Sequence, residues 1–159
     1  MEPTPFETIY RAYRQDVFRY SLWLCGDVEE AEEITSTAFF RAWTSAPLRE
    51  GTAKSYLLAI ARNLFLDGKR RGRRLVPLEN AGAPRSPDAD PETRTHVRKL
   101  YELLQGLEAK YRDPLMLWAA GGLSYGEIAA ELAVPLAVVK TRIHRARLLL
   151  AGMMEKGES

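Results

Sequence analysis

Residues 122–150 read GLSYGEIAAELAVPLAVVKTRIHRARLLL, a pattern that predicts two helices separated by a three-residue turn. Ser124 followed three residues later by Glu127 is typical of a capping box, so a short helix is expected to start here. Ala133-Val134-Pro135 predicts a tight break, and a longer basic helix is expected from Leu136 to about Leu150. A short helix, a tight turn and a longer basic helix are the elements of a helix-turn-helix, whose second helix enters the major groove of DNA.

The longer helix of this pair has one apolar face and one basic face. At about 100° per residue, its apolar side chains fall on one arc; they are Leu136, Val139, Ile143, Ala146 and Leu150. The side chains expected to contact DNA are Lys140, Thr141, Arg142, His144, Arg145 and Arg147. Arginine and lysine can donate hydrogen bonds to O6 and N7 of guanine, so those on the side opposite the apolar arc can read bases. Arg142 lies away from the middle of that side and suits a backbone phosphate better. The alternative is a solvated basic face on an ordinary core helix.

Two further helices are expected before the helix-turn-helix. Apolar side chains recur at helical spacing at Val97, Leu100, Leu104 and Leu107. This spacing predicts an amphipathic helix that begins near Thr95. Asp113-Pro114 predicts the start of the next helix, because proline is favoured at the first helical position. Residues 95–159 are therefore expected to form a helix-turn-helix domain.

Three helices are expected in a first domain, residues 1–75. Apolar spacing predicts helices over 6–24 and 54–67, and Asp27 followed by Glu30 predicts a helix that runs to about Trp43. Four aromatic side chains are expected in the cores, with Phe40 as a possible exception at the edge of a protein interface; they are Phe39, Phe40, Trp43 and Trp118.

Residues 76–94 contain four prolines among small and polar residues, which predicts a linker. No strand pattern occurs. The predicted fold is all-α, with two small helical domains: an N-terminal three-to-four-helix bundle and a C-terminal helix-turn-helix, joined by the proline-containing linker.

The charge of the chain is small in total but uneven along it. The 159 residues carry 23 basic and 21 acidic side chains, a net charge of +2. Residues 67–74 carry five basic and one acidic side chain, net +4, and residues 135–150 carry four basic and no acidic ones. Two separated cationic segments on a nearly neutral chain indicate two contacts with a polyanion, although each run alone is also typical of solvated surface.

The first cationic segment follows the helix expected over 54–67. The basic side chains of this segment, together with Arg62 of the preceding helix, attract phosphate with a strength that falls as the salt concentration rises. The candidate phosphate-binding residues of the segment are Lys69, Arg70 and Arg71. Tyr56 and Asn63 add stacking and base-edge hydrogen bonding, which suit an unpaired strand better than a closed duplex. The alternative is that Tyr56 packs in the core and Asn63 bonds to local backbone.

The sequence excludes several classes of protein. Cys25 is the single cysteine, so no disulfide within the chain is expected, and no Cys/His cluster offers a metal site. The first residues lack a signal-peptide pattern and no apolar run approaches a membrane span, so a cytoplasmic protein without membrane insertion is expected.

His96 and His144 have no Ser or Cys partner at a recognisable spacing, and no phosphate-binding glycine loop occurs. Neither enzymatic activity nor a cofactor is expected. The acidic residues 29–33 could hold a metal, but they fit a solvated helix start better.

These segments together resemble the extracytoplasmic-function (ECF) sigma factors of bacterial RNA polymerase. Residues 122–150 are similar to the promoter-binding helix-turn-helix of that family. GDVEEAEEITSTAFFRAW at 26–43 and SYLLAIARNLFLDGKRRGRR at 55–74 are similar to its polymerase-binding and promoter-melting helices. The resemblance covers roughly residues 6–74 and 96–150. It implies an initiation factor, monomeric when free, whose partners are core RNA polymerase, promoter DNA and an anti-sigma factor.

The resemblance also implies roles for individual positions. The last helix would read the upstream (−35) promoter element, and the helix over 54–67 with its basic tail would grip the −10 element. Asn63 and Arg62 are the best candidates to hold a flipped-out base. Docking on polymerase would use Glu33, Ser36, Thr37 and Phe40.

Two positions depart from the family pattern. Family members usually carry Gln-Glu where this chain has Ser36-Thr37, and often Trp where it has Tyr56. Losing an amide and an acidic group from the docking face is expected to weaken or retarget the polymerase contact. This difference motivates an alternative function, a sigma-like decoy that sequesters an anti-sigma factor without driving transcription. An ordinary duplex-binding repressor is a third interpretation.

Overall fold

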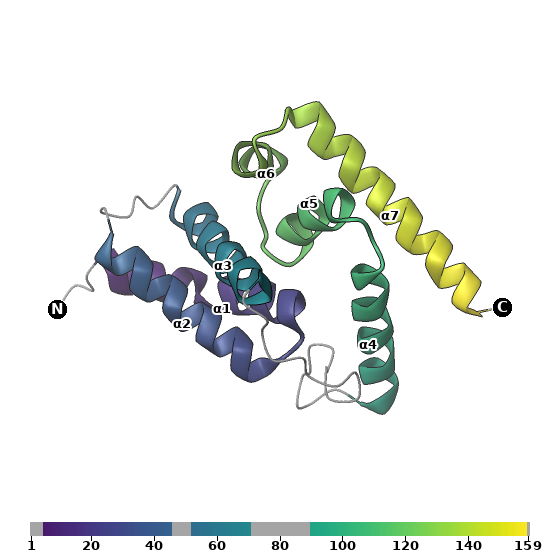
Figure 1. Cartoon of the computed structure of the whole chain (residues 1–159), viewed down its shortest axis with the longest axis horizontal. Helices are drawn as coiled ribbons and strands as arrows, with labels where there is room; N and C mark the ends of the chain where they lie inside the picture. The colour runs from purple at the N-terminus through teal and green to yellow at the C-terminus, as the bar shows by residue number, and fades with distance from the viewer. Residues whose placement is uncertain (1–4, 46–51, 71–89, 159) are drawn as a thin grey trace. The chain divides into compact units, whose positions relative to one another are not determined.

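The computed structural model describes residues 5–45, 52–70 and 90–158, which form seven α-helices and contain no strand. Figure 1 shows how these helices follow one another along the chain. The chain divides into two compact units, with the boundary between Ala81 and Gly82. Helices α1 to α3 belong to the N-terminal unit and α4 to α7 to the C-terminal unit. The all-α fold with two small helical domains is confirmed.

The N-terminal unit consists of three helices that pack pairwise around one apolar core. They are α1 (Pro5–Cys25), α2 (Val28–Thr44) and α3 (Ala53–Arg70). The fully buried side chains of this core come from all three helices and include Val17, Tyr20, Ala38, Leu57 and Leu58. Because each helix contributes an apolar stripe at helical spacing, burial of these stripes holds the bundle together.

Local signals set the ends of these helices. Gly26 adopts a left-handed conformation, with φ of 72°, and ends α1. The carboxylate of Asp27 then accepts a hydrogen bond from the backbone N–H of Glu29 at 3.1 Å and caps α2 at the predicted position, although a capping box with Glu30 would use the N–H of Glu30 instead. Helix α3 continues to Arg70, so Lys69 and Arg70 lie on its last turn. Arg71 lies outside the described residues.

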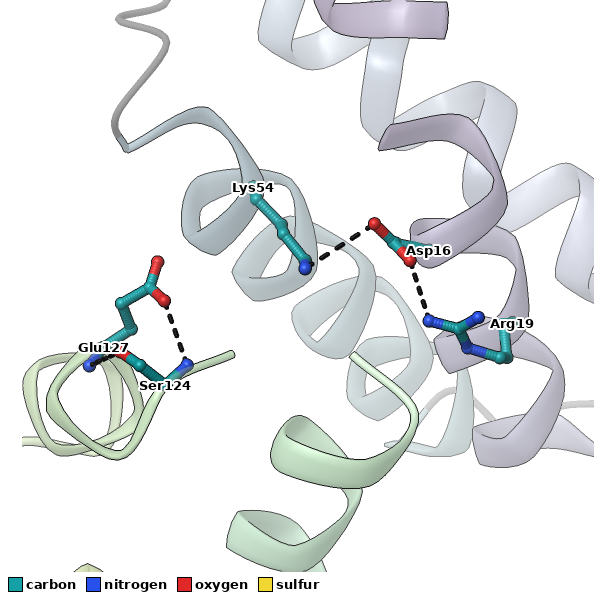
Figure 2. A network of polar contacts seen from close by, with 5 residues as sticks. All are labelled: Asp16, Arg19, Lys54, Ser124 and Glu127. Atoms are coloured by element: carbon teal, nitrogen blue, oxygen red, sulfur yellow. Dashed lines mark hydrogen bonds and ion pairs between the residues drawn. The ribbon is translucent and has the colours of Figure 1, made fainter. Parts of the chain in front are cut away.

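A small ion-pair network lies on the surface between α1 and α3. The Asp16 carboxylate of α1 lies 2.7 Å from the Arg19 guanidinium and 3.6 Å from the Lys54 ammonium of α3. Figure 2 shows Asp16 between these two basic side chains. Such partly exposed pairs contribute about 0–1 kcal/mol each. The network therefore orients these two helices, but the apolar core accounts for most of the stability.

The C-terminal unit consists of α4 (Pro91–Gln105), α5 (Ala109–Ala119), α6 (Tyr125–Leu132) and α7 (Leu136–Glu158). Helices α5, α6 and α7 pack against one another, and α4 packs against α7. Their shared core contains Leu117, Leu123, Ile128, Val139 and Ile143. The last helix extends eight residues beyond the predicted end at Leu150, because Met153 in this extension is half-buried and packs near Gly106 at the end of α4.

Two helix starts differ from the prediction. Helix α4 begins at Pro91, because Asp90 accepts a hydrogen bond from the N–H of Thr93 at 2.7 Å and caps it, so residues 91–94 are helical rather than part of the linker. Helix α5 begins at Ala109, and Pro114 lies inside it. Proline cannot donate the backbone hydrogen bond that a helix interior requires. Here its ring is buried beside Leu115, and this packing offsets the missing bond.

Candidate nucleic-acid interface

The helix-turn-helix forms as the sequence predicts. At the start of α6, Ser124 Oγ accepts from the N–H of Glu127 at 3.1 Å, and a Glu127 carboxylate oxygen accepts from the N–H of Ser124 at 3.0 Å (Figure 2). Helix α6 ends at Leu132, and its C-cap residue Ala133 adopts a left-handed conformation with φ of 56°. Pro135 follows, and the N–H of Val139 donates to its carbonyl at 3.2 Å in the first turn of α7.

Packing of α7 settles which of its sides is available to a partner. Val139, Ile143 and Ala146 are buried against the rest of the unit. The opposite side is exposed and carries most of the residues predicted to contact DNA: Lys140, Thr141, His144 and Arg145. Arg147 is also exposed, but it lies at the border of the buried side. Arg142 is half-buried, and the Thr141 hydroxyl donates to the carbonyl of Ala137 at 3.0 Å. The predicted apolar arc is correct except at Leu136, which begins the helix and is exposed.

Arg147 differs from the other basic side chains of α7. Its guanidinium carbon lies 5.6 Å from the ring centroid of Trp118 on α5. The Trp118 ring lies in turn 6.1 Å from that of Tyr125, the first residue of α6. Trp118, predicted to lie in the core, is 37% exposed, because it packs at the edge of the unit under Arg147 rather than inside it.

The predicted −10 residues on α3 form two neighbouring rows. Tyr56, Asn63 and Arg70 are spaced by seven residues, so their positions fall within about 40° on the helix, and all three are exposed. Arg62 and Lys69 form an adjacent row, with Arg62 half-buried and Lys69 exposed. These rows place aromatic, amide and basic groups along one side of α3.

Two contacts orient side chains in these rows. The Tyr56 hydroxyl lies 2.9 Å from Ser45 Oγ, and its side chain is 41% exposed, so the alternative of a core tyrosine is wrong. The Lys69 ammonium lies 5.2 Å from the ring centroid of Phe65. Both groups thus remain at the surface of the bundle.

The predicted docking residues share one face of α2. Glu33, Ser36 and Phe40 are exposed and Thr37 is half-buried. Phe39 lies in the core as predicted, but Phe40 is 61% and Trp43 64% exposed, so the expectation of a buried Trp43 is wrong. The Trp43 ring packs beside Phe6, with centroids 5.5 Å apart. The sequence prediction did not include Trp43 in the docking face, although its position three residues after Phe40 places it near that face.

Neither a metal site nor a membrane segment is found in the parts of the chain that the structure describes. No group of three or more His, Cys, Asp or Glu side chains there is arranged to hold a metal ion. No described helix combines the length and apolar character needed to cross a bilayer.

Both halves of the chain match known protein families. Residues 9–75 match Sigma-70 region 2, and residues 97–150 match Sigma-70, region 4. The ECF RNA polymerase sigma factor SigE of Mycolicibacterium smegmatis is 35% identical over 163 residues, a match that covers 97% of this chain but only 63% of that relative. The probable RNA polymerase sigma-C factor of Mycobacterium bovis is 32% identical over 149 residues, covering 89% of this chain and 78% of that protein.

Two solved structures share the fold. The sigma factor RpoE from Bartonella quintana, in complex with the anti-sigma factor NepR, matches with a TM-score of 0.72 and 21% identity, over 96% of this chain and 98% of that one. CnrH, in complex with the cytosolic domain of CnrY, matches with a TM-score of 0.70 and 20% identity, over 95% of this chain and 88% of that one. With both sigma-70 regions present in order, and with relatives of this identity and coverage, the chain belongs to the ECF sigma factors of the sigma-70 family.

Proposed function

We propose that this protein is a transcription initiation factor that binds core RNA polymerase and directs it to specific promoters. The observation that carries the proposal is the exposed basic side of α7, which is fixed by the buried residues Val139, Ile143 and Ala146. A surface of this kind, in a chain that also contains a region 2 domain, suits promoter recognition at two places.

The −35 element would be read by the first half of α7. Lys140, His144 and Arg145 are exposed on one arc and can donate to base edges in the major groove. Arg142 lies beside this arc and is assigned to a backbone phosphate, which adds affinity without sequence preference. Further along the same arc lie Leu148 and Glu155, both exposed. Because an apolar and an acidic group do not suit phosphate, DNA contact is expected to end before Leu148.

The −10 element would be bound by the two rows on α3. Tyr56 offers a ring for stacking, and Asn63 offers a donor and an acceptor for a base edge. The basic groups of Arg62, Lys69 and Arg70 would attract the backbone of the same strand. Unpairing one base costs a few kcal/mol, so a surface that accepts the extruded base helps to open the duplex.

Two protein partners are proposed. The α2 face with Glu33, Ser36, Thr37 and Phe40 would dock on core RNA polymerase. One of the two solved structures described above is a complex with an anti-sigma factor, and the other is a complex with the cytosolic domain of CnrY. We propose a partner of the anti-sigma class for this chain as well. The chain is proposed to be monomeric when free.

A decoy that sequesters an anti-sigma factor is the second candidate function. Ser36 and Thr37, at positions where the family usually carries Gln-Glu, favour it because they change the docking face. The exposed base-reading side of α7 favours initiation instead, since a decoy needs no side chains for bases.

Transcription in vitro separates these functions. Core RNA polymerase with the full chain is expected to give transcripts whose start sites share two upstream elements, whereas core enzyme alone gives none. Asn63→Ala is expected to slow duplex opening, and Arg145→Ala to change the preferred upstream element. Tight anti-sigma binding without any chain-dependent transcript would establish the decoy. Operator binding with no association to core enzyme would establish a repressor.

A further inference from the structure

Three side chains from three helices form a row on the surface of the C-terminal unit. Arg147 of α7 lies over the ring of Trp118 on α5 at 5.6 Å, and the centroid of Trp118 lies 6.1 Å from that of Tyr125, at the start of α6. We define these residues as the Arg147–Trp118–Tyr125 row. The row therefore joins the three helices that make up the helix-turn-helix core.

The contact suits the chemistry of both partners. A guanidinium is planar and delocalised, so it is attracted to the negative face of an indole ring and can lie flat on it. Tyr125 directly follows the capping residue Ser124, whose two hydrogen bonds fix the backbone at this point. One end of the row is thus anchored, and the other end is carried by α7, the helix proposed to read DNA.

Base reading is sensitive to rotation of α7 about its axis. Side-chain tips lie roughly 6 Å from a helix axis, so a rotation of about 20° displaces them by about 2 Å. A hydrogen bond tolerates only a few tenths of an ångström in donor–acceptor distance. The buried residues Val139, Ile143 and Ala146 pack by shape alone, whereas Arg147 adds a directional contact on one side of the helix.

We infer that Arg147 is a positioning residue, which acts through Trp118 to fix the rotation of α7 about its axis rather than by contacting a phosphate. This replaces the direct DNA contact expected from the sequence for Arg147. The inference rests on the proposed function, in which α7 reads the −35 element.

The free protein gives the first test. In the full chain labelled with ¹⁵N, the indole N–H signal of Trp118 is identified by its loss in Trp118→Leu. Arg147→Ala is expected to shift this signal, because the guanidinium leaves the ring, while Arg142→Ala leaves it in place. An unchanged Trp118 signal in Arg147→Ala means that the contact is not populated in solution and overturns the inference.

Promoter binding gives the second test. The probe is a promoter duplex, selected from random-sequence DNA by core polymerase with the unchanged chain, and binding is measured over a salt series. Arg147→Ala and Trp118→Leu are each expected to reduce the preference for that duplex over scrambled DNA by about tenfold. The double variant is expected to lose no more of this preference than either single variant, because both substitutions remove the same contact.

The salt series distinguishes positioning from phosphate contact. Each lost phosphate contact lowers the slope of log K against log salt by about 0.9. Arg142→Ala is expected to show this loss, whereas Arg147→Ala and Arg147→Lys are expected to keep the slope while losing preference. Additive effects of Arg147→Ala and Trp118→Leu, or a reduced slope in Arg147→Ala, overturn the inference. A chain that forms no promoter complex overturns the proposed function and the positioning role with it, while the indole signal still reports whether the contact exists.

Discussion

The capping box at Ser124 gives a prediction whose magnitude follows from the structure. Helix α6 has eight residues, too few for a helix that is stable by itself. Ser124 Oγ accepts the N–H of Glu127 at 3.1 Å, and Ser124→Ala removes this acceptor while the reciprocal bond from the Ser124 N–H can remain. Loss of such a cap costs about 1 kcal/mol. We therefore expect about fivefold more frequent local opening of α6.

Hydrogen–deuterium exchange of the α6 amides in the full chain measures this opening. Ser124→Asp is the matched control, because its carboxylate keeps an acceptor at the same position and favours the positive end of the helix dipole. Exchange in Ser124→Asp is expected to match that of the unchanged chain. If α6 exchanges at the same rate in Ser124→Ala as in the unchanged chain, or if Ser124→Asp opens as often as Ser124→Ala, the capping argument is wrong.

Three further predictions concern base reading, the core and pH. Arg145→Ala is expected to relax the base preference at one upstream position by about 1–3 kcal/mol. The measurement is the affinity for duplexes that carry each of the four bases at that position. Equal weakening of binding to all four duplexes would indicate a phosphate contact instead. Ile143→Ala is expected to lower the free energy of unfolding, measured in urea, by about 2–5 kcal/mol, because Ile143 is fully buried. The control is Leu149→Ala, which is expected to change the free energy of unfolding by less than about 0.5 kcal/mol because Leu149 is exposed. Hydrogen bonds from the backbone and side chain of Thr93 hold the pKa of Asp90 below its ordinary value. The Asp90 carboxylate therefore stabilises the start of α4 above about pH 3.9, and this stabilisation is lost as the pH falls through the lowered pKa. Asp90→Asn is expected to remove the resulting pH dependence of amide exchange in α4, and a pH dependence that persists in the variant would contradict the assignment.

The local signals in the sequence were sufficient for the helix-turn-helix. The Ser124 and Glu127 pattern is satisfied by hydrogen bonds within one turn, and the break at 133–135 depends on backbone conformation alone. The same holds for the Asp27 cap. Such features are predictable because every group involved lies within a few residues of its partner.

The start of α5 was not predictable in this way. Asp113-Pro114 is a local start signal, yet the helix begins at Ala109 and continues through the proline. The signal is overridden because Pro114 and Leu115 are buried by other helices, a gain that no short window of sequence contains. Local preference is therefore a weak guide where tertiary burial is large.

By itself, the sequence determined that the chain is helical, where most helices begin, and which side of α7 is basic, since these depend on spacing and on bonds between near neighbours. Only the tertiary structure decided which aromatic side chains are covered. Phe39 is buried while Phe40 and Trp43 remain exposed, and Trp118 meets Arg147 at the surface. The physical reason is that burial depends on how neighbouring helices are placed around a side chain, and this placement brings together residues that are distant in the sequence.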